Sequence, residues 1–148
     1  MSETVLIRTI MEIVDDAVDQ IERLEPGEKF EPRTYLIAGG GSWAVPVSWQ
    51  EIKWEVKTEV AVIQRVLRYA REIGAKAVVT MMLERYRRIK TLSFRGDIGG
   101  LRRNNPMVLF VNIKNSDGHL VHLLSFDNIK GRHRASKRLW GEVNNDYR

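Results

Sequence analysis

Residues 107–126 read MVLFVNIKNSDGHLVHLLSF, and this stretch decides the fold. Apolar runs at 107–114 and 119–126 flank the turn residues 115–118, which predicts a β-hairpin. The strand period of two places two sets of side chains on opposite faces: Met107, Leu109, Val111 and Ile113 with Leu120, His122, Leu124 and Phe126, and Val108, Phe110, Asn112 and Lys114 with Val121, Leu123, Ser125 and Asp127. Because both faces are mainly apolar, we expect the hairpin to lie in the centre of a sheet.

Two long helices are predicted outside this hairpin. Apolar residues recur at three- and four-residue spacing over 3–24 and again over 49–73. Pro26 and Gly27 end the first helix, while Ser48 and Glu51 form a capping box at the start of the second. The apolar stripe of the second helix is the wider one, so we expect it to be the most buried helix.

Three further strands are predicted at 34–38, 43–47 and 77–83. The glycine cluster between the first two predicts a hairpin turn, and Pro46 restricts the second strand to a sheet edge. The cluster lacks the geometry of a nucleotide-binding loop, because seven residues separate it from the next helix.

The basic segments at 84–106 and 129–148 carry weaker signals. Glycine and arginine content at 84–106 predicts an exposed loop with a strand near 91–95, and the tail from 129 predicts a short helix near 133–141. The whole pattern predicts an α+β fold in which a mainly antiparallel sheet of four to five strands packs against the two long helices.

The composition bounds the class of protein. A chain of 148 residues suits a single globular domain. It has no cysteine, which excludes a disulfide scaffold and every thiolate metal site. No apolar run reaches the roughly 18 residues of a membrane span. The N-terminus turns acidic where a secretory signal would stay apolar. We therefore expect a cytoplasmic protein without a membrane partner.

The net charge of +5 is distributed very unevenly along the chain. Residues 1–32 hold three basic and nine acidic side chains, a net charge of −6. Residues 33–83 carry +3, and residues 84–148, with fourteen basic and six acidic side chains, carry +8. Such asymmetry is typical of a chain whose basic part contacts a polyanion.

Arginine dominates the basic part, and its planar fork binds phosphate oxygens in pairs. We therefore expect a nucleic-acid-binding protein whose phosphate contacts come from two clusters: Arg85, Arg87, Arg88, Arg102 and Arg103, and Arg132, Arg134 and Arg138. Such contacts carry little sequence specificity. A competing interpretation is that the acidic first helix neutralises a basic face of the same molecule.

The histidines of the hairpin do not predict a metal site. His119 and His122 are three residues apart on a strand and so point to opposite faces. We expect His122 to be a core histidine whose ring is hydrogen-bonded.

A second function class is a metal-dependent nuclease, and its candidate catalytic residues are Asp97, Asn112 and Lys114. The segment Phe-Val-Asn-Ile-Lys-Asn at 110–115 resembles the strand of the restriction-endonuclease-like superfamily that carries an acid, one residue, then lysine. The resemblance covers about twenty residues and implies Mg²⁺ as cofactor; without it, no cofactor is expected. Asn112 stands where the second carboxylate belongs, so another acid, such as Glu84 or Asp127, would have to complete the site.

A third function class is a protein-interaction module. In this alternative the acidic helix of one copy binds the basic surface of another copy, which gives a homo-oligomer, or it binds the basic surface of a different protein. A small-molecule pocket beside the glycine turn is a further alternative.

Overall fold

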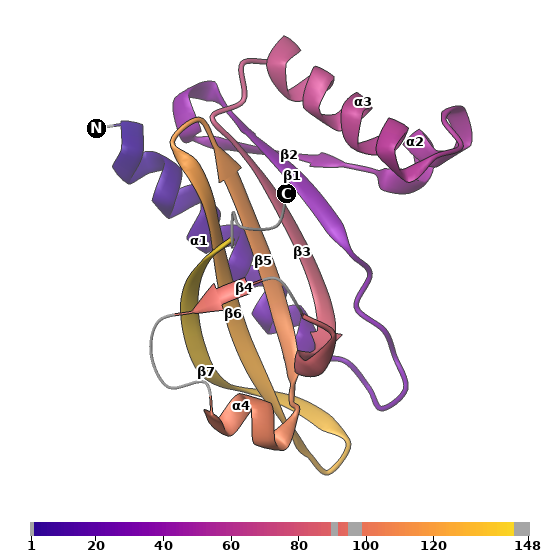
Figure 1. The fold of residues 1–148 in the computed structure, drawn as a ribbon, viewed down its shortest axis with the longest axis vertical. Coiled ribbons are helices and arrows are strands. Elements are labelled where there is room, and N and C mark those ends of the chain that lie inside the picture. The colour runs from indigo at the N-terminus through magenta and orange to yellow at the C-terminus, as the bar shows by residue number, and fades with distance from the viewer. Residues whose placement is uncertain (1, 90–91, 95–98, 144–148) are drawn as a thin grey trace.

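The computed structural model describes residues 2–89, 92–94 and 99–143, and within these residues seven strands form one antiparallel sheet (Figure 1). The sheet order is β2-β1-β3-β5-β6-β7-β4. The strands are β1 (Arg33–Ala38), β2 (Trp43–Val47), β3 (Ala77–Arg85), β4 (Leu92–Phe94), β5 (Met107–Asn115), β6 (Gly118–Ile129) and β7 (Arg132–Val143). The α+β class is confirmed, whereas the expected number of four to five strands was too low.

Helices lie on both faces of this sheet. They are α1 (Ser2–Glu22), α2 (Trp49–Glu55), α3 (Glu59–Glu72) and α4 (Gly99–Asn104), with short 3₁₀ turns η1 (Gly39–Gly41) and η2 (Tyr86–Arg88). Buried residues of α1 pack with Val79 and Val111 on one face, and Val66 and Ala70 of α3 pack with Leu36 on the other. No helix in the described ranges is long and apolar enough to cross a membrane.

The predicted central hairpin is confirmed. The side chains of β5 and β6 share faces as expected, with Leu109 opposite Leu124 and Val111 opposite His122. They lie between β3 and β7 in the interior of the sheet. The Gly39–Gly41 turn joins β1 to β2, and β2 forms the sheet edge, as Pro46 predicts.

The second predicted helix is divided in two. Val56 has an extended backbone, and the Thr58 side chain accepts a hydrogen bond from the Ala61 N–H to begin α3. Because of this break, α3 is rotated about its axis relative to the single continuous helix that was predicted, so a different set of its side chains faces the sheet. Val60 is therefore 65% exposed, while Val62 on the sheet-facing side is 1% exposed. The expectation that 49–73 forms the most buried helix was wrong.

The predicted basic helix near 133–141 was also wrong, because residues 132–143 form β7. Lys130 and Gly131 both have positive φ, 54° and 83°, and they form a tight turn from β6 into β7. β7 pairs with β6 over most of its length. This pairing satisfies backbone groups that would otherwise leave an edge of the central hairpin open. Strand β4 agrees with the strand expected near 91–95.

Candidate functional site

Five arginines lie at one end of the sheet, and we call them the η2–α4 arginines: Arg85, Arg87, Arg88, Arg102 and Arg103. The Tyr86 N–H donates to the Pro106 carbonyl over 2.9 Å, and the Arg87 N–H donates to Asn105 Oδ1 over 2.8 Å. These bonds hold η2 against the connection between α4 and β5. The side chain of Leu101, 6% exposed, anchors α4. Segments 18 residues apart in sequence thus bring their arginines together.

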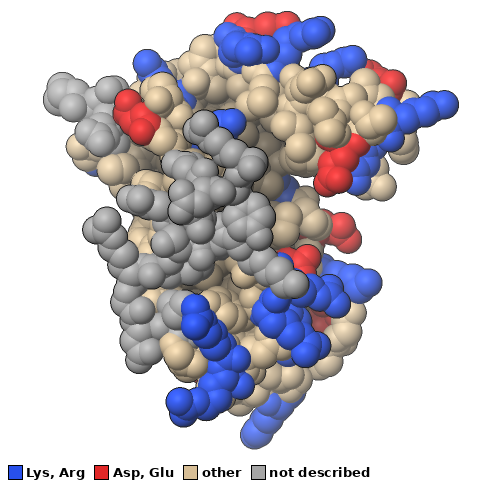
Figure 2. Space-filling model, in the orientation of Figure 1, with Lys and Arg blue, Asp and Glu red and all other residues tan. Residues whose placement is uncertain are grey.

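The η2–α4 arginines are exposed, and little negative charge neutralises them. Among the residues that the structure describes, Arg88 is the member of this group that forms an ion pair. Its Nη1 lies 3.7 Å from Glu84 Oε2. The Arg88 side chain remains 71% exposed. Figure 2 shows basic side chains gathered on the lower part of the molecule, over the same end of the sheet.

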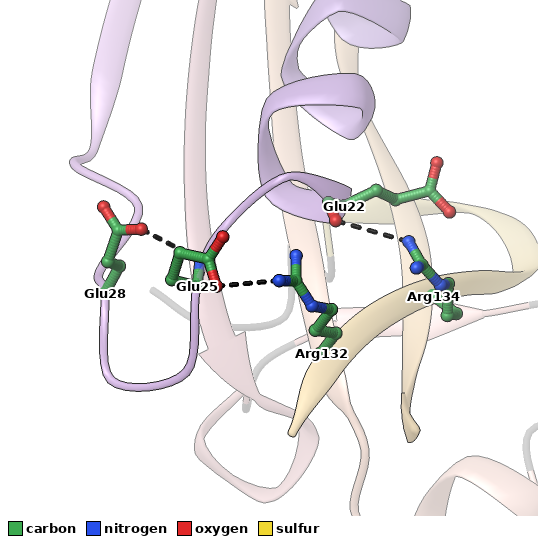
Figure 3. A network of polar contacts seen from close by, with 5 residues as sticks. All are labelled: Glu22, Glu25, Glu28, Arg132 and Arg134. Carbon is green, nitrogen blue, oxygen red and sulfur yellow. Dashed lines mark hydrogen bonds and ion pairs between the residues drawn. The ribbon is translucent and has the colours of Figure 1, made fainter. Parts of the chain in front are cut away.

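The β7 arginines, Arg132, Arg134 and Arg138, are held by helix α1 and the loop that follows it. Arg132 pairs with Glu25 at 2.8 Å, and Arg138 pairs with Asp15 at 3.5 Å. Arg134 donates to the Glu22 carbonyl at 3.3 Å, at the negative end of the α1 dipole (Figure 3). The acidic N-terminal region thus partly neutralises these three arginines, as the competing interpretation of the charge pattern proposed.

η2, which carries Arg87 and Arg88, packs on the face opposite α1, where Tyr86 contacts the cluster of Val108 and Leu123. The β7 arginines instead contact α1 and the loop after it, and α1 packs on the other face. Burial lowers the pKa of His133 on β7, and the positive charge of Arg85 lowers that pKa further. The η2–α4 arginines are the less neutralised of the two groups in the described part of the chain.

The residues predicted for a nuclease are only partly placed together. Asn112 and Lys114 lie on the same face of β5, while Asp97 lies outside the described residues. Glu84 is opposite Val108, four residues along β5 from Asn112, and it pairs with Arg88. Asp127 is opposite Arg134 near the far end of β6. No group of three or more His, Asp or Glu side chains in the described ranges could hold a metal ion.

The two hairpin histidines lie on opposite faces, as the strand period predicts. His122 is 1% exposed and stacks on Trp140, with ring centroids 3.9 Å apart. Neither ring nitrogen has a hydrogen-bond partner among the described residues, so the expected hydrogen bond was wrong. Burial lowers the pKa of His122 to about 4, and Arg138 lowers it as well while Asp15 opposes them. The ring is therefore neutral near pH 7.

A hollow between α3 and the sheet was not found from the sequence. It includes Asn112, Lys114 and His119 on the face opposite α1, together with Trp49 and Thr80. It lies on the other face from the glycine turn, where the sequence had offered a pocket. Its walls come from segments distant in sequence. The sequence therefore indicated only that Asn112 and Lys114 share a face of the strand. Another aromatic, Trp54 of α2, is 82% exposed.

Comparisons with known proteins give no family for this chain: no family model matches it, and no curated protein and no solved structure matches it either. The functional interpretation therefore depends on the charges and geometry described above.

Proposed function

We propose that the protein binds nucleic acid through the phosphate backbone, and that the η2–α4 arginines make the principal contacts. This proposal is supported by five exposed arginines from β3, η2 and α4 that meet at one end of the sheet. Within the described residues, the acid that pairs with this group is Glu84, which binds Arg88. Arginine binds phosphate oxygens bidentately, so a compact group of this kind suits a polyanion of regularly spaced phosphates.

The β7 arginines make a smaller contribution to binding. Each of them already has an oxygen partner in α1 or the following loop, and that partner must be displaced or shared when a phosphate binds. Arg132 and Arg138 therefore contribute less to affinity than an arginine without such a partner.

The proposed mode of binding has low sequence specificity. Contacts to phosphates fix the position of a protein on the backbone, whereas sequence is read at the base edges. The contact needs no cofactor. Its affinity depends strongly on salt, because each neutralised phosphate releases condensed counterions.

The test is a titration of the protein against a labelled duplex and a labelled single strand at several salt concentrations. We expect the logarithm of the association constant to fall linearly with the logarithm of salt concentration, by about 0.9 per phosphate contact on duplex DNA and about 0.7 on a single strand. Absence of binding at low ionic strength, or binding that does not respond to salt, would overturn the proposal.

A further inference from the structure

Two adjoining hollows lie between α3 and the face of the sheet opposite α1. The first has a volume of about 290 Å³ and the second about 620 Å³, and they share Leu67 and Lys114 in their walls. They are formed where α3 leaves part of β3, β5 and β6 uncovered. Volumes of this order suit a small organic molecule.

The first hollow has one apolar side. Ile63, Val66 and Leu67 of α3 and Val78 of β3 line this side. Trp49 completes this side, and its indole Nε1–H donates to Thr34 Oγ1. Thr34 is 1% exposed, so the indole is attached to a buried point of the sheet. An aliphatic chain placed here would leave water for a preformed apolar wall.

The opposite side of the first hollow is polar, and Lys114 supplies its charge. His119 lies directly opposite Lys114 in the β5–β6 ladder, and its Nε2–H donates to Asn112 Oδ1. Burial lowers the pKa of His119, and the charge of Lys114 lowers that pKa further. His119 is therefore neutral near pH 7, and the Lys114 ammonium is the cation of this hollow.

The second hollow adds two more cations to the same end. Arg71 and Lys76 lie in its wall together with Lys114, and neither hollow has an Asp or Glu in its wall. In the described part of the chain, these three cations form no ion pair with a carboxylate. Three cationic side chains thus lie beside an apolar wall, and within the described ranges none of them is paired with a carboxylate.

We propose that these hollows bind a small amphipathic carboxylate, an aliphatic chain that ends in one carboxyl group. The carboxylate lies beside Lys114 and within reach of Arg71 and Lys76, while the chain lies along the apolar wall formed by α3 and Trp49. A free phosphate suits this place less, because it has no apolar body for that wall. The site is separate from the η2–α4 arginines and does not depend on nucleic-acid binding.

Octanoate, with two matched ligands, tests the proposal by isothermal titration calorimetry on the full chain. Octanol has the same chain without the charge, and acetate has the charge without the chain. We expect octanoate to bind about tenfold more tightly than either, because each lacks one half of the recognition. Equal affinity for octanoate and acetate would indicate attraction to surface charge alone and would overturn the proposal.

Two substitutions locate the binding. Lys114→Met removes the charge and keeps most of the side-chain volume, and it should weaken octanoate binding about tenfold. Lys57→Met is the control, because Lys57 is an exposed lysine outside both hollows and its replacement changes the net charge equally. Octanoate affinity that is unchanged in Lys114→Met, or reduced equally in both variants, would contradict the assigned site. Nucleic-acid affinity measured on the same Lys114→Met protein distinguishes this site from the arginine surface.

Discussion

Arg132 donates to Glu25 over 2.8 Å between Nη2 and Oε2, although 107 positions separate the two residues in the sequence. The pair joins the start of β7 to the loop after α1. Asp15 and the Glu22 carbonyl bind Arg138 and Arg134 in the same way. The acidic N-terminal region and the basic C-terminal region are therefore partners, and of the two arginine groups the η2–α4 arginines keep more of their charge available.

Releasing Arg132 should increase affinity for nucleic acid. In Glu25→Gln the carboxylate that neutralises Arg132 is lost, so the guanidinium gains freedom to contact a phosphate. Glu12→Gln is the matched control, because Glu12 is an exposed acid of α1 that forms no ion pair among the described residues. We expect the salt slope of Glu25→Gln to steepen by about one unit relative to this control, measured by fluorescence anisotropy. Identical slopes would show that the pair does not restrain Arg132.

The contact between the glycine turn and α1 predicts a position-specific loss of stability. Gly41 has φ of +102°, and a Cβ there would lie 3.0 Å from the Cβ and 3.1 Å from the backbone nitrogen of Leu6. Gly40 has φ of +70° and open space around it. Gly40→Ala should cost about 1 kcal/mol through its backbone, and Gly41→Ala about 3 kcal/mol because α1 must also shift. Urea denaturation of both variants measures the difference, and equal losses would contradict the close packing.

His122 predicts a dependence of stability on pH. Its pKa is about 4 in the folded protein and near 6.5 in the unfolded chain, where burial is absent. The unfolded chain therefore takes up a proton first as the pH falls. The free energy of unfolding is therefore unaffected by the titration of this group above pH 6.5, and it falls progressively as the pH falls from 6.5 toward 4. Linkage gives a loss of about 3 kcal/mol over this range.

Replacing the ring isolates this contribution. His122→Phe keeps an aromatic ring beside Trp140 and removes the titration. We expect the free energy of unfolding, measured by urea at pH 7.5 and pH 4.5, to fall by less in this variant than in the parent chain. Parallel falls in the two proteins would mean that His122 does not determine the acid sensitivity.

The division of the second helix predicts that α3 depends on its own cap. Thr58 Oγ1 accepts from the Ala61 N–H over 3.2 Å. Thr58→Ala should lower the free energy of unfolding by about 1 kcal/mol, because it leaves that donor without its partner. Thr58→Ser keeps the hydroxyl and should retain most of the stability. A serine variant as unstable as the alanine variant would indicate that the hydroxyl does not cap the helix.

The fold could be predicted from the sequence where one local signal dominated. The turn at 115–118 and the apolar runs on both sides predicted correctly which side chains of β5 and β6 share a face. Local signals failed at β7, because its strand state depends on pairing with β6 and not on its own residues. They failed again at 56–58, because the apolar residues keep a helical spacing through this region although the backbone of Val56 is extended.

The candidate site could be predicted only in outline. The arginines were evident as a charge pattern, yet which of them are neutralised depends on contacts such as Arg138 with Asp15, 123 positions apart. The shared face of Asn112 and Lys114 followed from the strand period. The hollow beside them did not, since Ile63 and Trp49 come from helices whose position on the sheet is a tertiary property.

The most direct test of the proposed function compares two triple variants that remove equal charge. One is Arg87→Ala, Arg102→Ala, Arg103→Ala, and the other is Arg132→Ala, Arg134→Ala, Arg138→Ala. Both are titrated with the same duplex over a salt series, after circular dichroism has confirmed folding. We predict that the first variant loses about three units of salt slope and the second less than half of that. Equal losses, or the larger loss in the second variant, would contradict the assignment of the principal contacts to the η2–α4 arginines.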